Sequence, residues 1–106
     1  MITEKKIKEI VDKIISNYQP EKIILFGSYA NGNPDMNSDL DLFIIKNTKT
    51  PKQKRGRELR KYLYGSLVPM DLKIYTPQEF NDELTNRYSF LFSAIKGSKT
   101  LYERKN

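Results

Sequence analysis

The sequence contains no cysteine and no histidine. Without cysteine, disulfides, thiolate metal sites and a cysteine nucleophile are excluded. Without histidine, serine–histidine–aspartate hydrolysis, histidine general bases and histidine-ligated metals are excluded as well. Any metal ion must therefore be held by oxygen ligands, which favours a hard cation such as Mg²⁺.

Long apolar segments are also missing. The longest uninterrupted apolar runs have four residues, at 23–26 and 42–45, whereas a membrane-spanning helix needs about 20. Residues 1–6 lack the apolar core of a signal peptide. We therefore expect a cytoplasmic protein without a membrane span.

Length and composition are those of a small globular protein. The chain has 106 residues, of which 38% are hydrophobic and 30% are charged. These values are typical of one folded domain with a modest core. We expect a single domain over residues 1–106.

The net charge of +6 is unevenly distributed. Segment 46–61 contains eight lysine or arginine residues and one glutamate, so it carries +7, and the rest of the chain nets −1. Such a run is either a solvated helix face or a patch that attracts a polyanion, for example a triphosphate, RNA or an acidic protein. The sequence leaves both interpretations open.

Hydrophobic periodicity and turn signals predict alternating helices and strands. Helices are expected at about 4–18, 50–64, 76–84 and 88–96, a short turn or helix at 29–31, and strands at 22–26, 39–45, 68–75 and 99–103. Thr3 is expected to cap the first helix, and Thr50 and Thr76 to open capping boxes. The order predicts an α/β (α+β) protein, a small mixed β-sheet with helices packed against it.

The basic helix at 50–64 lacks an apolar face in its first half. We therefore expect that half to be exposed or mobile. Tyr62 and Tyr64, at its end, are expected to include a core residue.

Three acidic residues on predicted strands are candidates for a metal site. Asp39 and Asp41 lie two residues apart on one strand, so both side chains leave the same face, with Cα atoms roughly 6.5–7 Å apart. Asp71 lies on strand 68–75, on the face opposite its apolar residues, and joins the pair if the two strands are neighbours. Two carboxylates about 5 Å apart repel by roughly 3 kcal/mol at an effective dielectric near 20, and a divalent cation offsets this best.

The alternative is that all three aspartates are incidental, Asp39 starting a strand and Asp41 lying on a wet face. The apolar run at 42–45 argues against this, because an acid flanked by a core run is poorly explained by solvation alone. We therefore favour a site.

Gly27 and Ser28 end a predicted strand and open a turn or short helix. Backbone N–H groups and a hydroxyl at such a position suit a β- or γ-phosphate. A Gly-Ser pair alone is a common turn. Its spacing makes it more specific, because ten residues separate Ser28 from Asp39.

Gly27-Ser28, ten residues and Asp39-Leu40-Asp41 together resemble the signature of the nucleotidyltransferases of the DNA polymerase beta superfamily. The surrounding segments GSYANG, SDLDLFII and VPMDLKIY resemble its minimal nucleotidyltransferase group. The resemblance covers residues 23–75 and implies the nucleotidyltransferase fold.

The resemblance also implies roles for five residues. Asp39 and Asp41 would hold two Mg²⁺ ions, and Asp71 would complete the metal site and help to activate the acceptor hydroxyl. Gly27 and Ser28 would contact the nucleoside triphosphate. The protein would then be a Mg²⁺-dependent nucleotidyltransferase, with Lys46, Lys73 and residues 52–61 as candidate phosphate or partner contacts.

Many minimal nucleotidyltransferases are the antitoxins of toxin–antitoxin pairs whose toxin is a HEPN-type ribonuclease. The resemblance implies transfer of AMP from ATP to a tyrosine hydroxyl of such a toxin, docked from outside. One departure is Asn31, where similar sequences often have an arginine; the change removes a candidate phosphate contact or ion pair.

Two other functions stay open at this point. The first is a weakly active or inactive binding module of the same fold that neutralises its partner by complex formation. The second is a small nucleic-acid binder that uses the basic helix, although the sequence offers no aromatic stacking platform for it.

Overall fold

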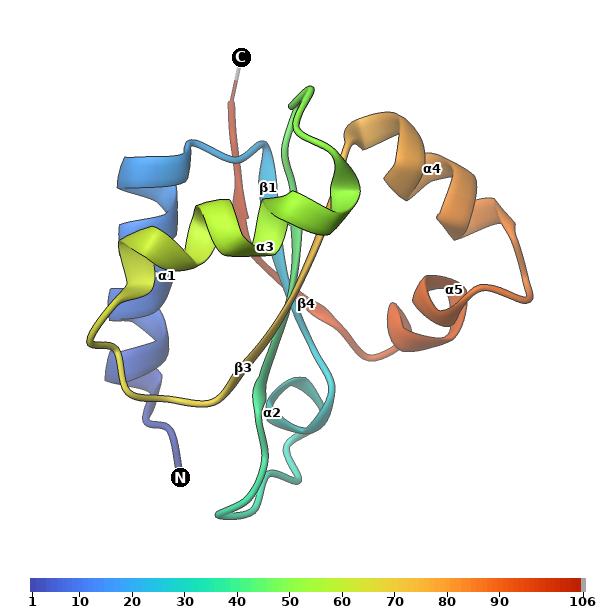
Figure 1. Cartoon of the computed structure of the whole chain (residues 1–106). Coiled ribbons are helices and arrows are strands. Elements are labelled where there is room, and N and C mark those ends of the chain that lie inside the picture. Colours follow the sequence, from blue (N-terminus) through green and yellow to red (C-terminus); the bar gives the residue numbers. More distant parts are fainter. Residues whose placement is uncertain (106) are drawn as a thin grey trace.

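The computed structural model describes residues 1–105. Four strands form one sheet in the order β3-β2-β1-β4, with helices on both faces (Figure 1). The elements are α1 (Glu4–Tyr18), β1 (Lys22–Phe26), α2 (Ser28–Asn31), β2 (Leu40–Ile45), α3 (Lys52–Arg60), the 3-10 turn η1 (Lys61–Leu63), β3 (Met70–Tyr75), α4 (Pro77–Thr85), α5 (Phe90–Ala94) and β4 (Lys99–Glu103).

The sheet is mixed, as expected. Strands β2 and β3 run parallel, and β1 is antiparallel to both β2 and β4. The parallel pair is joined through α3, which supplies the crossover that a parallel connection requires. The expected α/β class is confirmed, and none of the helices within residues 1–105 is long and apolar enough to cross a membrane.

Two helix starts follow the predicted capping signals. The Thr3 hydroxyl accepts a hydrogen bond from the backbone N–H of Lys6 at the start of α1. At the start of α4, Thr76 and Glu79 form a capping box in which each side chain accepts from the other residue's backbone. These bonds satisfy N–H groups that have no partner within the helix.

The capping box predicted at Thr50 is wrong. Helix α3 begins after Pro51 without a side-chain cap. The Thr50 hydroxyl instead donates to Glu58 Oε2 at 3.0 Å, and its carbonyl oxygen accepts from Arg55 Nε at 2.9 Å. Both partners lie further along α3, and they draw Thr50 away from the capping position.

The expectation that the first half of α3 is exposed or mobile is wrong for Arg55, which is only 5% exposed. Its guanidinium donates to both carboxylate oxygens of Glu79, at 2.6 and 3.3 Å, and to the carbonyl oxygen of Ile74 at 3.3 Å. A buried arginine is tolerated because paired hydrogen bonds replace its hydration. Tyr62 and Tyr64 are 41% and 93% exposed, so neither is a core residue.

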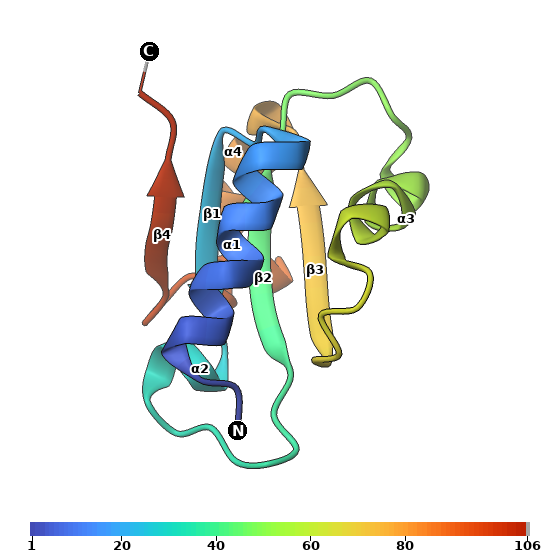
Figure 2. The same ribbon diagram turned by 90° about the vertical axis from the view of Figure 1, so that its left-hand side faces the viewer.

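Each face of the sheet has its own core. Helix α1 and η1 pack on one face, against side chains that include Leu42, Ile44 and Ile74, and Figure 2 shows α1 lying across β1 and β2. Helices α4 and α5 pack on the other face, where the rings of Phe26 and Phe43 stack with centroids 4.0 Å apart. The alternation predicted for residues 68–75 is borne out.

Candidate active site

Asp41 and Asp71 lie on the face of the sheet that carries α4 and α5, and Asp39 lies just before β2. Asp41 and Asp71 are direct register partners on the parallel strands β2 and β3, which places their backbones about 4.8 Å apart. Asp39 precedes the first residue of β2, and its negative charge acts on the Asp41 carboxyl. The expected acidic cluster requires β2 and β3 to be neighbours, and they are.

Electrostatics also links the three groups. Burial raises the pKa of the Asp41 carboxyl, and the negative charges of Asp71 and Asp39 raise it further, while Lys73 opposes them. Lys73 Nζ lies 3.7 Å from Asp71 Oδ2, with both side chains partly exposed. The face therefore concentrates like charges that one lysine offsets only in part.

Gly27 brings the end of β1 against Asp41. A Cβ atom at position 27 would lie 2.1 Å from Asp41 Oδ2, so the carboxylate occupies the space that a side chain would need. Gly27 has φ 74° and ψ −154°, a region that essentially only glycine adopts. The sequence indicated a turn at Gly27, but only the structure shows its contact with the carboxylate.

Ser28 begins α2 beside this contact, at the end of the sheet where β1 stops and β2 and β3 start (Figure 1). Helix α2 has only four residues, so its dipole adds little, and a phosphate here would depend on the Ser28 hydroxyl and nearby N–H groups. Asn31, at the other end of α2, lies against Gly97, with Oδ1 2.8 Å from the Cβ position of that glycine.

The family described as "Polymerase beta, Nucleotidyltransferase" matches residues 5–106. The chain belongs to this family.

Two relatives of this nucleotidyltransferase domain come from Methanocaldococcus jannaschii. The protein named "Putative protein adenylyltransferase MJ0604" is 49% identical over 47 residues, 42% of this chain and 47% of that protein. The match thus spans about half of the relative's length. "Putative protein adenylyltransferase MJ1215" is 36% identical over 77 residues, 68% of this chain and 88% of that protein.

A solved structure has the same fold. The crystal structure described as a "putative nucleotidyltransferase" from Sulfolobus solfataricus superposes with a TM-score of 0.65. The superposition covers 94% of this chain and 79% of that chain, at 20% sequence identity. At this identity the likeness supports the nucleotidyltransferase fold and says nothing about the substrate.

The candidate site offers hard oxygen donors, which fit Mg²⁺ in type. Within the part of the chain that the structure describes, no three candidate ligands converge closely enough to enclose a metal ion by themselves. Mg²⁺ is commonly bound by one or two carboxylates together with waters and substrate phosphates. The aspartates therefore fit an ion that arrives with a nucleotide better than a permanent structural metal.

Phe90 is a neighbour of the site that the sequence did not reveal. Its ring contacts Phe26 and Phe43 edge-on, with centroids 5.9 and 6.3 Å apart, yet it is 57% exposed. Lys73 Nζ lies 5.2 Å from the Phe90 centroid, so this lysine stands between the ring and Asp71. The apolar spacing of α5 predicts a helix, but it does not indicate which side chain stays exposed.

Lys73 and Lys46, both candidate phosphate contacts, lie in different environments. Lys46 follows the last residue of β2, at the opposite end of that strand from Asp41. Its ammonium group donates to the carbonyl oxygens of Tyr18 and Gln19, at 2.6 and 3.3 Å. Lys46 therefore caps the C-terminal end of α1. Of these two lysines, Lys73 is the one that lies beside Asp71.

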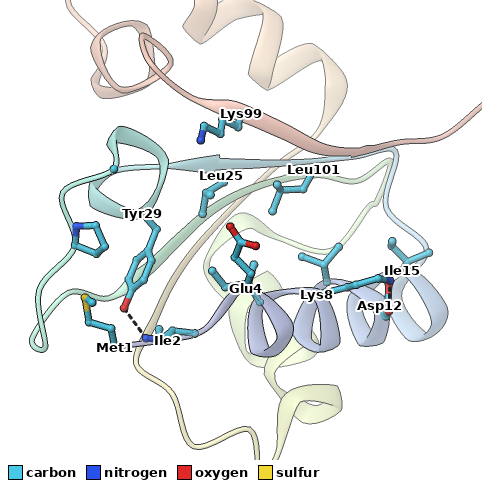
Figure 3. Close-up of a pocket in the computed structure, with 14 residues that line it drawn as sticks. Met1, Ile2, Glu4, Lys8, Asp12, Ile15, Leu25, Tyr29, Lys99 and Leu101 are labelled. Carbon is cyan, nitrogen blue, oxygen red and sulfur yellow. Dashed lines mark hydrogen bonds and ion pairs between the residues drawn. The ribbon is translucent and has the colours of Figure 1, made fainter.

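Two hollows of the surface have none of Asp39, Asp41 and Asp71 in their lining. A groove of about 710 Å³ opens between α1, Tyr29, Leu25 and β4 on the other face of the sheet (Figure 3). The Tyr29 hydroxyl there accepts from the backbone N–H of Ile2 at 2.9 Å, so this tyrosine covers the core. A hollow of about 340 Å³ lies between α3 and β3 and includes Lys73 in its lining.

Proposed function

We propose that the protein is a Mg²⁺-dependent protein adenylyltransferase, which transfers AMP from ATP to a tyrosine hydroxyl of a partner protein. The observation that carries the proposal is the register of Asp41 and Asp71, side by side on β2 and β3 and next to the Gly27 backbone. The names of the two Methanocaldococcus relatives support a protein as the acceptor.

Each residue has a proposed role. Asp39 and Asp41, with Asp71, would hold Mg²⁺ together with the triphosphate. When bound, the divalent metal supplies positive charge that offsets the phosphates and lowers the pKa of the acceptor hydroxyl. Gly27 leaves room for the chain to approach the triphosphate, and the Ser28 hydroxyl donates to a phosphate oxygen.

Asp71 is proposed to receive the acceptor's proton. As the tyrosine oxygen attacks the α-phosphorus, the new oxygen–phosphorus bond forms, the bond to the β-phosphate breaks and pyrophosphate leaves. The proton of the hydroxyl passes to a carboxylate oxygen of Asp71. Lys73, 3.7 Å from that carboxylate, is placed to stabilise negative charge on the phosphates.

The proposed partner is a HEPN-type toxin, which would make this protein the antitoxin of a toxin–antitoxin pair. A neighbouring gene for a short helical protein with an Arg-x₄₋₆-His motif would support this partner. Without such a neighbour, and with no rescue of a co-expressed HEPN toxin, the antitoxin part of the proposal fails while the transferase part stands.

The transferase part is tested by following labelled AMP from ATP and Mg²⁺ into a co-purified partner. We expect Asp41→Asn to lower transfer on the order of 10³-fold, because one lost metal ligand removes several kcal/mol of transition-state stabilisation. Asp12→Asn is the matched control, since Asp12 is exposed on α1 and, within residues 1–105, forms an ion pair only with Lys8.

Undiminished transfer by Asp41→Asn would refute the assignment. If the wild-type protein transfers no AMP and Asp41→Asn still protects cells fully from the partner, the binding-module function is correct instead. The Asp41→Asn variant thus distinguishes an enzyme from an inactive binding module of the same fold.

A further inference from the structure

Two large apolar side chains stand almost fully in solvent on the turn that leads into β3. Tyr64 is 93% exposed and Leu67 is 94% exposed. The turn itself is well defined: the Ser66 N–H donates to the Leu63 carbonyl oxygen at 3.1 Å, and Gly65 has φ 85°, as in a type II turn. Leu63 and Ser66 are buried, so the turn is anchored while Tyr64 and Leu67 project outward.

The backbone at Leu67 is unusual as well. Its φ of 58° lies in the left-handed region, which disfavours leucine and suits asparagine or glycine. A turn selected only for solubility would carry a small polar residue here. A strained backbone that presents a large apolar side chain is instead typical of sites that bind something.

Five exposed cations precede this turn on α3 and η1: Lys52, Lys54, Arg57, Arg60 and Lys61. Within residues 1–105 none of them forms an ion pair with an acidic side chain. Arg55, in the same helix, is paired with Glu79. Five of the eight cations of segment 46–61 are therefore not neutralised by an acidic side chain of the described residues.

We use the name α3 patch for Arg57, Arg60, Lys61, Tyr64 and Leu67. Arg60 Nη2 donates to the carbonyl oxygen of Met70 at 3.1 Å, and the residue after Met70 is Asp71. Figure 2 shows α3 beside β3 and the connecting loop reaching the start of that strand. Arg60 therefore links the α3 patch to the start of β3, the outer strand of the sheet, one residue before Asp71.

We propose that the α3 patch docks the acceptor protein through an acidic, tyrosine-containing segment. The inference rests on the proposed function, because docking here delivers a hydroxyl to the side of Asp71. Unpaired cations steer an acidic segment to this edge, and Leu67 and Tyr64 supply apolar anchors. The exposed ring of Tyr64 could stack on a base, but Leu67 favours a protein over RNA because an aliphatic side chain offers no such face.

The probe for this surface is a fluorescent random copolymer of glutamate and tyrosine, which is acidic and carries acceptor hydroxyls. Binding is measured by anisotropy at about 50 and 150 mM salt. We expect the double substitution Arg57→Glu/Lys61→Glu to weaken binding at least tenfold, and Leu67→Asn to weaken it severalfold. Leu67→Asn suits the left-handed backbone, so the fold is retained.

The matched control is Lys5→Glu/Lys13→Glu, which makes the same charge change at exposed positions of α1. We expect it to change binding less than twofold. Equal weakening by the control and by the patch variant would overturn the proposal, because attraction would then be general. Tighter binding of poly(U) RNA than of the copolymer at about 150 mM salt would overturn it in favour of nucleic acid.

Transfer to the copolymer distinguishes this proposal from the proposed function. We expect Asp41→Asn to bind the copolymer like the wild type but to transfer no AMP to it. If the wild type binds through the α3 patch and transfers nothing, the adenylyltransferase proposal fails and the docking surface stands. If transfer occurs and the patch variants support it with unchanged KM, the docking proposal fails.

Discussion

The two faces of the sheet differ in how completely helices cover them. On the face under α1, Leu40, Leu42 and Ile44 of β2 are all 0% exposed. On the other face the same strand begins with the half-buried Asp41 and continues with the buried Phe43 and Ile45. Helices α4 and α5 pack over the aromatic side chains of this face, and Asp41, the register partner of Phe26, lies in the candidate site.

The two faces of the sheet contribute differently to the stability of the fold. Apolar side chains under α1 contribute through burial alone. The aspartates on the opposite face repel one another, and like charges placed directly across strands destabilise a sheet. Asp41 and Leu42 are adjacent in one strand but act in opposite ways. Burial of Leu42 stabilises the fold, whereas the charge of Asp41 destabilises it. Substitutions at these two positions test the contrast directly.

The largest expected effect is on the covered face. Leu42→Ala removes a fully buried side chain under α1, and we expect the free energy of unfolding to fall by about 2–5 kcal/mol. Urea denaturation followed by circular dichroism measures it. A loss below about 1 kcal/mol would mean that this face is not tightly packed.

On the acidic face, Gly27→Ala tests the contact between β1 and Asp41. The new methyl group would overlap Asp41 Oδ2, so the carboxylate must move, and we expect kcat/KM for AMP transfer to fall about 100-fold. Gly32→Ala is the control, because Gly32 also has a positive φ but nothing lies within 4 Å of its Cβ position. Equal losses of activity in the two variants would attribute the effect to backbone strain alone.

We expect Asp41→Asn to raise the free energy of unfolding while it removes AMP transfer. Burial, Asp71 and Asp39 raise the pKa of Asp41, so the folded state holds this proton more tightly than the unfolded chain does. Ionisation of Asp41 therefore lowers the free energy of unfolding. This loss is absent below the ordinary pKa of an aspartate and grows as the pH rises through the raised pKa. At pH 7 we expect a gain of about 0.2–1 kcal/mol.

Thermal unfolding at several pH values checks this sign. The difference in Tm between Asp41→Asn and the wild type should be small near pH 3 and full by about pH 7. Added Mg²⁺ and ATP should stabilise the wild type and not the variant. Asp12→Asn, which loses the exposed Lys8 pair at 3.1 Å, should lower stability slightly, so a loss of stability in both variants would contradict the prediction.

The smallest effect concerns a polar atom within the covered face. Tyr18 is 3% exposed, and within residues 1–105 its hydroxyl has no hydrogen-bond partner. The pKa of Tyr18 is raised to about 12, chiefly by burial and also by the negative charge of Glu58, while Arg55 opposes the shift. The folded state therefore keeps the proton, and the stability this provides is lost as the pH rises from about 10 through about 12.

We expect Tyr18→Phe to be neutral at pH 7, or stabilising by up to about 1 kcal/mol. Above about pH 10 the variant should lose less stability than the wild type. Tm measured from about pH 8 to 11 tests the sign, and parallel pH curves for the two proteins would show that this hydroxyl does not titrate with unfolding.

Local signals in the sequence predicted most elements well. The extent of α1, its Thr3 cap and the capping box at Thr76 depend on residues within a few positions of one another, and all three are confirmed. The error at Thr50 has a different origin. The Thr50 hydroxyl donates to Glu58 and its carbonyl oxygen accepts from Arg55. Arg55 in turn pairs with Glu79, 24 positions along the chain. No local pattern in the sequence reveals such a partner.

Alternation along the strand predicted that Asp41 faces away from Leu40 and Leu42, because successive side chains of a strand point in opposite directions, and the structure buries both leucines under α1. Only the tertiary structure decided that Asp71 stands across from Asp41, that Gly27 touches its carboxylate, and that Leu67 is left in solvent. Strand order and register follow from packing between segments far apart in the chain, and these long-range contacts have no local signature.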